Sequence, residues 1–507
     1  MTVTKKNGFD NEKYLAEQTA SILERVEQFG DKLYLEFGGK LVFDYHAARV
    51  LPGYDPNVKI RLLRELQDQA EILVCIFAGD IARKKIRADF GIPYDVDALK
   101  LIDDLRDWGL RVGGVVITRF ADQPAARVFR ARLERRGVRV FTHRATRGYP
   151  TEVDLIVSDD GYGANEFIPT DRPIVVVTGP GPGSGKLGTC LSQLFHEHRH
   201  GIQAGYAKFE TFPIWNLPLK HPVNVAYEAA TVELNDVNLI DPFHLAAYGE
   251  QAVNYNRDVE AYPLLQRILE RITASAAIYR SPTDMGVNRA GFAIVDDLAV
   301  REAARQEVIR RHFRYACEFA VGLVEREDAD RAELIMESLG LSEEDRKVVG
   351  PARAAAAGAE AAGKGNDGSY CGAAIELADG TIVSGRNSAL MHAASAVVLN
   401  AIKHLSRIPD EIHLLAPTIM QSIANLKKDI LKMKSVSLDL EETLIALGMS
   451  ATANPAAKVA MQRLESLSGC EFHTSHIPTP GDEAGLRRLG VNVTSDPNFA
   501  SRSLFIN

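Results

Sequence analysis

Residues 174–194, IVVVTGPGPGSGKLGTCLSQL, decide the fold of the first half of this chain. The branched apolar run Ile174–Thr178 predicts a buried strand, and the apolar periodicity after Lys186 predicts a helix. The glycine-rich segment between them predicts a loop that holds an anion. Backbone N–H groups at a helix start are free to bind phosphate, and the helix dipole favours negative charge there.

The loop supplies most of the candidate ligand-binding residues. Glycines let a backbone approach phosphate closely and adopt positive φ, and Lys186 stands where a single cation reaches the terminal phosphates. We therefore predict binding of ATP or GTP with magnesium, or of another phosphorylated small molecule, with Lys186 also catalytic. The predicted binding residues are Gly179, Gly181, Gly183, Ser184, Gly185, Lys186 and Thr189.

The loop departs from the P-loop pattern G-x-x-x-x-G-K-[ST] at two positions. Pro180 replaces the first glycine and Leu187 replaces the hydroxyl residue that normally contacts magnesium. The nearest hydroxyls belong to Ser184 and Thr189, so magnesium coordination stays open. The alternative is a turn between strand and helix that binds nothing.

Strand-length apolar runs alternate with helical patterns in the N-terminal half. This alternation predicts an α/β fold, a doubly wound, mostly parallel sheet with helices on both faces. Ligands of such sheets bind at the carboxyl ends of the strands. The expected strands are Leu33–Phe37, Ile72–Phe77, Val112–Thr118, Val138–Thr142, Val153–Ser158 and Ile174–Thr178, and the expected helices include Val96–Trp108 and Ala125–Arg136.

Polar residues follow several of these strands and predict a shared cleft. Asp80 follows one strand, Arg119 another, and Asp159 a third. Asp159 is our candidate metal ligand, although aspartates after strands are also common turn formers. Arg119 and Arg83 either pair with phosphate or are ordinary surface arginines.

Residues 205–300 are less regular and contain three polar segments: 227–233, 254–258 and 281–288. The last follows a predicted helix, Leu264–Tyr279. Polar loops on an α/β scaffold often contact substrate, and here we choose Asp284, as a catalytic residue, and Asn288. The alternative is that these segments are surface turns with satisfied hydrogen bonds.

A competing motif, H-E-x-x-H, lies at residues 196–200. On a helix, His196 and His200 share a face as zinc ligands do, and Glu197 would activate a metal-bound water, as in a zinc-dependent hydrolase. We do not expect zinc, because no third ligand follows at the spacing of the longer motif. The helical pattern also leaves Ser192, His196 and Arg199 on the polar side, and basic residues in a last turn complement the helix dipole.

The C-terminal third is predicted to be a separate unit. Helices are expected at Ala299–Val324 and Asp328–Leu339, and Ser342 with Asp345 forms a capping signal. Two strands joined at 378–380 form a hairpin signal, and helix Ala389–His404 and strand Glu411–Leu415 follow. We expect an α/β domain at 1–325, a helical connector at 326–350 and a C-terminal α/β domain at 351–507.

Residues 350–425 resemble the cytidine-deaminase fold. The resemblance rests on an alanine-rich helix, the hairpin GAAIELADGTIVSGRN, the His392-Ala393 helix start and a strand ending at Ala416-Pro417. That family has H-A-E and P-C-x-x-C at its zinc site. Here Ala394 replaces the glutamate, and Thr418 and Gln421 replace the cysteines. The resemblance implies a domain without zinc that does not deaminate. A generic hairpin-and-helix unit explains the pattern almost as well.

Composition narrows the class of protein. A formal net charge of −8 argues against a dedicated nucleic-acid-binding protein. Five widely spaced cysteines, a polar N-terminus and no long apolar run predict a cytoplasmic protein without disulfides or a membrane span. The compact C-terminal unit makes a homo-oligomer our expectation.

Over nearly its whole length the chain resembles the bacterial DUF1846 (UPF0371) family. Three phrases carry this resemblance: TGPGPGSGKLGTCLSQL, YCGAAIELADGTIVSGRNSALMHAASA and DPFHLAAYGEQAVNYNRDVE. It implies no substrate and no activity. Three hypotheses therefore stand: a nucleotide-dependent transferase or hydrolase, a zinc hydrolase, and a non-catalytic metabolite-binding or assembly protein.

Overall fold

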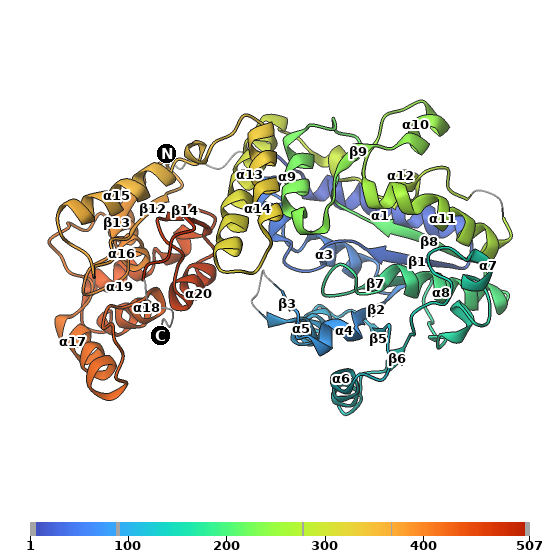
Figure 1. Cartoon of the computed structure of the whole chain (residues 1–507), viewed down its shortest axis with the longest axis horizontal. Helices are drawn as coiled ribbons and strands as arrows, with labels where there is room; N and C mark the ends of the chain where they lie inside the picture. The colour runs from blue at the N-terminus through green and yellow to red at the C-terminus, as the bar shows by residue number, and fades with distance from the viewer. Residues whose placement is uncertain (1–6, 88–91, 276–277, 367, 502–507) are drawn as a thin grey trace. The chain divides into compact units, whose positions relative to one another are not determined.

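The computed structural model describes residues 7–87, 92–275, 278–366 and 368–501 (Figure 1). The chain forms two compact units. Among the described residues, the N-terminal unit comprises those up to Glu228 together with Asn235–Ala304, and the C-terminal unit comprises Ala229–Leu234 together with those from Arg305 onward. Within the described residues, no helix is long and apolar enough to cross a membrane.

The N-terminal unit is built on a seven-stranded sheet with the order β11-β8-β1-β7-β2-β5-β6. Every neighbouring pair in this sheet is parallel, as expected for strands that are apolar on both faces. The strands are β1 (Lys32–Phe37), β2 (Ala70–Phe77), β5 (Val112–Thr118), β6 (Val140–Thr142), β7 (Ile174–Thr178), β8 (Ala204–Phe209) and β11 (Gly286–Val287).

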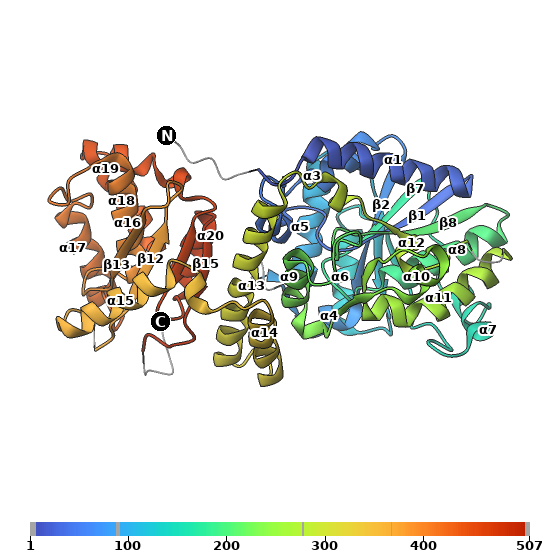
Figure 2. The ribbon, with the colours of Figure 1, turned by 90° about the horizontal axis from the view of Figure 1, so that it is seen from above.

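Helices cover both faces of this sheet, because alternate side chains of each strand point to opposite faces. Phe29, at the end of α1 (Asn11–Phe29), packs against Gly205, the register partner of Leu33. The neighbouring side chain Tyr34 points the other way and donates a hydrogen bond to Glu197 of α8 (Lys186–Arg199). Figure 2 shows α1 on one side of strands β1, β7 and β8 and α11 (Asn256–Thr273) on the other.

The remaining elements of the N-terminal unit are shorter or connect the strands. Two small antiparallel pairs join β3 to β4 and β9 to β10. These elements are α2 (Tyr45–Val50), α3 (Val58–Glu65), α4 (Ala78–Ala82), β3 (Ile86–Arg87), β4 (Ile92–Pro93), α5 (Tyr94–Asp107), α6 (Pro124–Glu134), α7 (Val153–Ile156), α9 (Pro222–Ala230), β9 (Asn238–Ile240), α10 (Pro242–Tyr248), β10 (Val253–Tyr255) and α12 (Pro282–Met285).

Two expectations for this unit were wrong, and one strand was not expected. Residues 153–158 are not a strand: 153–156 form the short helix α7, with Asp154 exposed and only Ile156 buried. A short apolar run does not by itself distinguish strand from helix. Strand β8 was missed because its sequence, AGYAKF, contains a glycine and a lysine. The helix expected at 264–279 runs from Asn256 to Thr273.

The C-terminal unit has its own four-stranded sheet, ordered β13-β12-β14-β15. The predicted hairpin is confirmed as β12 (Gly372–Glu376) and β13 (Ile382–Arg386), and the capping box of Ser342 and Asp345 is also confirmed. Helix α13 (Asp297–Ala320) begins in the N-terminal unit and continues into this one. The other elements are α14 (Arg326–Ser338), α15 (Val349–Ala361), α16 (Ala393–Ser406), α17 (Pro417–Asn425), α18 (Leu440–Ser450), α19 (Pro455–Met461), β14 (Glu471–Thr474), α20 (Pro480–Arg488) and β15 (Asn492–Ser495).

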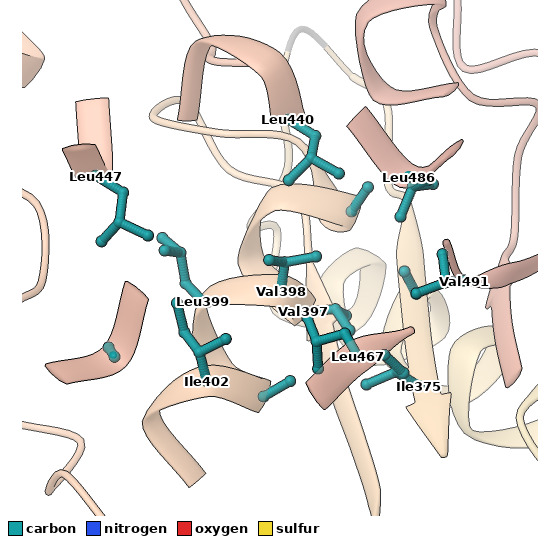
Figure 3. Packing of buried hydrophobic residues seen from close by; sticks show 14 of the residues in the cluster. Ile375, Val397, Val398, Leu399, Ile402, Leu440, Leu447, Leu467, Leu486 and Val491 are labelled. Carbon is teal, nitrogen blue, oxygen red and sulfur yellow. The ribbon is translucent and has the colours of Figure 1, made fainter. Parts of the chain in front are cut away.

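A large apolar core lies between the sheet and the later helices of the C-terminal unit. Figure 3 shows Val397 of α16 beside Ile375 of β12, with Val398 and Ile402 of the same helix and leucines from later segments in the same cluster. All four of these side chains are fully buried. Helix α16 therefore anchors the sheet to the remaining helices.

The strand expected at Glu411–Leu415 does not exist. Glu411, Ile412 and His413 are exposed, and only Leu414 and Leu415 reach the core. The hairpin instead pairs with β14, antiparallel, and β14 pairs with β15 in parallel. The resemblance to the cytidine-deaminase fold therefore has no support from the strand that was expected to complete it.

His392 at the start of α16 has a structural partner. Its Nδ1 lies 2.7 Å from Asp482 Oδ2, and this carboxylate raises the pKa of His392 above its ordinary value although burial opposes the shift. Asp482 also accepts a hydrogen bond from the Leu440 backbone N–H, so the pair joins three helices.

We predict that His392→Gln destabilises the protein more at pH 5.5 than at pH 8. A raised folded-state pKa stabilises the fold below the unfolded pKa of about 6.5, and that contribution is lost as pH rises through the folded value. The expected difference is about 1 kcal/mol. Urea unfolding of both proteins at the two pH values measures it. An equal effect of the substitution at both pH values contradicts the prediction.

Candidate functional site

The glycine loop connects the end of β7 to the start of α8, as predicted. Gly185 is the residue before the helix and has φ of 90°, in the left-handed region. A Cβ placed there would lie 2.6 Å from Thr118 Oγ1. Both the backbone conformation and the close approach of β5 therefore require glycine at this position.

The peptide groups of the loop are turned in one direction. The Gly183 carbonyl accepts a hydrogen bond from Arg119, and the Ser184 carbonyl accepts one from Thr118 Oγ1 at 2.7 Å. In a trans peptide the N–H points opposite to the carbonyl, so the N–H groups of Ser184 and Gly185 point away from β5. In the described structure, no hydrogen bond joins any N–H from Gly183 to Gly188 to an acceptor.

Two side chains of the loop are also left without strong partners. Ser184 is 1% exposed, and its buried hydroxyl has no hydrogen-bond partner among the described residues. Lys186 Nζ lies 3.5 Å from the Gly181 carbonyl oxygen, and no ion pair of Lys186 occurs among the described residues. A hydroxyl, an ammonium group and several free amides therefore surround one bend of the chain.

Of the arginines predicted near the strand ends, Arg119 contacts this loop and Arg83 has another partner. Arg119 lies against it: its guanidinium is 3.4 Å from the centre of the Phe77 ring, and burial lowers its pKa. Arg83 instead pairs with the buried Asp80. Of the strand-end residues that we expected to share a cleft with the glycine loop, Arg119 contacts the loop.

Two predicted site residues, Asp159 and Asp284, lie away from the loop. Asp159 pairs with Arg199 in the last turn of α8, whereas the loop precedes the first turn. Asp284 contacts Arg25 and Tyr248 and belongs to α12, beside the edge strand β11. That strand is the third from β7 in the sheet.

Thr189 faces the core below the loop. Thr189 is 1% exposed, and its Oγ1 accepts a hydrogen bond from Cys75 Sγ at 3.4 Å. Burial raises the pKa of the Cys75 thiol to about 12, so this thiol is neutral at physiological pH. Asn288 is likewise structural, because its amide donates hydrogen bonds to the carbonyls of Thr211 and Pro213.

The H-E-x-x-H residues have other partners. Glu197 is fully buried and accepts hydrogen bonds from Lys32 and Tyr34, both at 2.8 Å. His196 Nε2 lies 2.9 Å from the Asn165 carbonyl oxygen. Ser192, which we expected on the polar side of this helix, is fully buried. Across the described ranges, no three histidine, cysteine or acidic side chains are grouped as metal ligands.

Comparison with known proteins places the chain in a family. Residues 7–340 match the family described as "Domain of unknown function DUF1846, N-terminal", and residues 344–505 match its C-terminal counterpart. The chain belongs to the DUF1846 family.

Relatives in this family match almost end to end. A UPF0371 protein of Clostridium botulinum strain 657 is 58% identical over 501 residues, 99% of each chain. A UPF0371 protein of Clostridium tetani is 56% identical over 502 residues, 99% of this chain and 100% of the relative. Their names state only the family, so the activity of this DUF1846 protein has to be argued from its own residues.

Sequence reasoning missed a cluster of charged groups in this DUF1846 protein. It lies at the carboxyl ends of β1 and β8, near the loop, and centres on Lys208 and Glu210. Its members are Glu36, Tyr206, Lys208, Glu210, Tyr255 and Asp258. The only sequence signal was the polar density of residues 254–258, which supply Tyr255 and Asp258.

Proposed function

We propose that the glycine loop binds the phosphate groups of a nucleotide, ATP or GTP, or of another phosphorylated small molecule. The observation that carries this proposal is the row of N–H groups from Gly183 to Gly188 without acceptors. Such a concave row of amides at a helix start is a general anion-binding arrangement.

The surroundings of the loop support the same chemistry. Lys186 Nζ has no carboxylate partner in the described structure, so its charge is available to a bound anion. The carbonyl oxygens that would repel phosphate are bonded to Arg119 and Thr118. The unpartnered Ser184 hydroxyl adds one more donor at the base of the loop.

The residues present do not fit a magnesium site of the P-loop kind. Position 187 is leucine, the Thr189 hydroxyl accepts from Cys75, and Asp159 is bonded to Arg199 at the other end of α8. The proposal therefore rests on the amides and Lys186 alone. It includes phosphoryl transfer or hydrolysis in a cytoplasmic protein, acting on the phosphates that these groups hold.

We predict that Lys186→Ala weakens ATP binding about 10- to 100-fold. Loss of a charged hydrogen bond costs about 1.5–3 kcal/mol, and 1.4 kcal/mol corresponds to tenfold in affinity. Isothermal titration calorimetry with ATP, GTP and inorganic pyrophosphate, each with and without magnesium, measures the change. The exposed Lys220 provides the control, since Lys220→Ala removes the same charge from the same unit.

Two results would overturn the proposal. One is the absence of binding of all three probes to the wild-type protein at millimolar concentration. The other is binding that Lys186→Ala and Lys220→Ala weaken equally, because the site would then lie away from the loop.

A further inference from the structure

The cluster missed by sequence reasoning is arranged around one ammonium group. Lys208 Nζ lies 2.6 Å from Glu210 Oε1 and also contacts Asp258 Oδ2 and the Tyr255 hydroxyl. The Tyr255 hydroxyl in turn lies 3.4 Å from Glu210 Oε1. Three elements, β8, β10 and α11, thus hold a lysine between two carboxyl groups.

The carboxyl groups outnumber the lysine. Glu36 of β1 is the register partner of Lys208 and accepts a hydrogen bond from Tyr206 at 2.8 Å. Arg257, the next cation, is bonded to Asp236. When carboxylates lie close together, one of them tends to retain a proton. Here burial and the neighbouring carboxylates raise the pKa of Glu210 to about 7, although Lys208 opposes the shift.

The groups that face Glu210 and Lys208 come from every neighbouring element. Asp258 and Glu210 raise the pKa of Lys208 well above its ordinary value, so Lys208 stays charged. The facing groups are Glu36, Tyr206, Tyr227, Tyr255 and Asp258, with Arg257 next to the tyrosines. The pKa of Glu210 therefore lies near neutrality, whereas Lys208 keeps its proton.

The cluster lies beside the glycine loop on the α8 face of the sheet. Glu36 pairs in register with Val177, two residues before the loop, as well as with Lys208. Lys208 is therefore two strands from Val177, roughly 10 Å at the usual strand spacing. The pKa of Cys190, in the second turn of α8, is affected by both Glu36 and Lys186.

The cluster is also partly open. The side chains of Lys208, Glu210 and Asp258 are 15%, 13% and 23% exposed. The free N–H groups of Ser184 and Gly185 point away from β5. In the sheet, β2 and β5 lie on one side of β7, and β1 and β8 lie on the other side. A phosphate held by these amides would therefore lie on the side of the loop nearer Glu210.

We propose that Glu210 is the proton acceptor for a water molecule that attacks the terminal phosphate held by the glycine loop. The substrate class is a phosphate ester or anhydride. The water oxygen forms a bond to phosphorus while its proton passes to the Glu210 carboxylate. The bond between phosphorus and the bridging oxygen breaks, and the leaving group keeps the electron pair. Lys208 and Tyr255 position Glu210. This inference rests on the proposed function.

The test compares Glu210→Gln with the wild-type protein in release of inorganic phosphate from ATP, GTP and pyrophosphate. General-base catalysis contributes about 10²–10⁴-fold, so we expect at least a hundredfold lower rate, with binding of each probe within threefold of wild type. Glu260→Gln is the matched control, because Glu260 is exposed on α11, the helix of Asp258.

The dependence of rate on pH separates catalysis from a structural role. The wild-type rate should fall below a midpoint near pH 7, where Glu210 becomes protonated. Lys208→Met should move that midpoint to higher pH, because the lysine lowers the pKa of Glu210. This second variant tests the role of Glu210 even if Glu210→Gln does not fold, which thermal unfolding would reveal.

Each outcome decides the inference. Binding without phosphate release by the wild-type protein, a Glu210→Gln rate equal to wild type, or a midpoint unmoved by Lys208→Met would overturn it and leave phosphate binding intact. Absence of binding to all three probes would overturn the phosphate-binding proposal and this inference together.

Discussion

Replacement of Lys32 by methionine is expected to lower the free energy of unfolding of the N-terminal unit by about 3–5 kcal/mol. The side chain of Lys32 lies 2.8 Å from Glu197, which is fully buried. The substitution removes the only cation paired with that carboxylate in the described structure, and Glu197 Oε2 already lacks a hydrogen-bond partner. An uncompensated buried charge is among the most destabilising changes in a folded protein.

The double variant Lys32→Met with Glu197→Leu is the control for this prediction. When both charges are absent, no ionised group has to be desolvated, so most of the lost stability should return. Urea unfolding followed by circular dichroism measures all three proteins. If the single and double variants were equally unstable, the loss would come from packing rather than from charge. The experiment also assigns Glu197 of the H-E-x-x-H motif a structural role.

Arg346→Met is expected to destabilise the C-terminal unit by a similar amount, about 3–5 kcal/mol. Arg346 is 1% exposed, and its guanidinium lies 2.7 Å from a carboxylate oxygen of Glu471. It also donates to Thr494 Oγ1 at 2.8 Å and to the Asn492 carbonyl at 2.6 Å. One side chain therefore joins β14 to β15, and its loss leaves both strands with unsatisfied acceptors.

Hydrogen exchange measured by mass spectrometry locates the effect of Arg346→Met. Amides of β14 and β15 should exchange faster, while those of β7 and α8 in the N-terminal unit should not change. Lys347→Met is the matched control, since the neighbouring Lys347 has a side chain 71% exposed and pairs with Glu376 at the surface. Unchanged exchange in β14 and β15 would show that the fold does not depend on the buried arginine.

The sequence predicted the strands that are apolar on both faces. Val112–Thr118 and Ile174–Thr178 were placed with their observed bounds, because a parallel strand covered by helices needs a continuous branched apolar run. Strand β8 does not follow this rule. It carries Tyr206 and Lys208, the polar groups that give the carboxyl end of the sheet its chemistry.

The candidate site was predicted only where its residues are neighbours in the chain. The glycine loop is one continuous segment, so its strand-loop-helix pattern could be recognised. The partners of Lys208 and Glu210 come from β1, β10 and α11, which are distant in the chain. Contacts between distant segments produce no repeating pattern in a single sequence, so this cluster could not be recognised there. Asp159 was chosen as a metal ligand because a strand was expected before it, but the preceding element, α7, is a helix.

The order of strands has a consequence for synthesis on the ribosome. β1 is made early, but both of its neighbours, β7 and β8, are made much later. The hairpin of β12 and β13 likewise pairs with β14, which precedes only α20 and β15. Contacts so distant in sequence form slowly, so each nascent sheet exposes apolar edges until its last strands emerge. These edges are where we expect a chaperone to bind the growing chain.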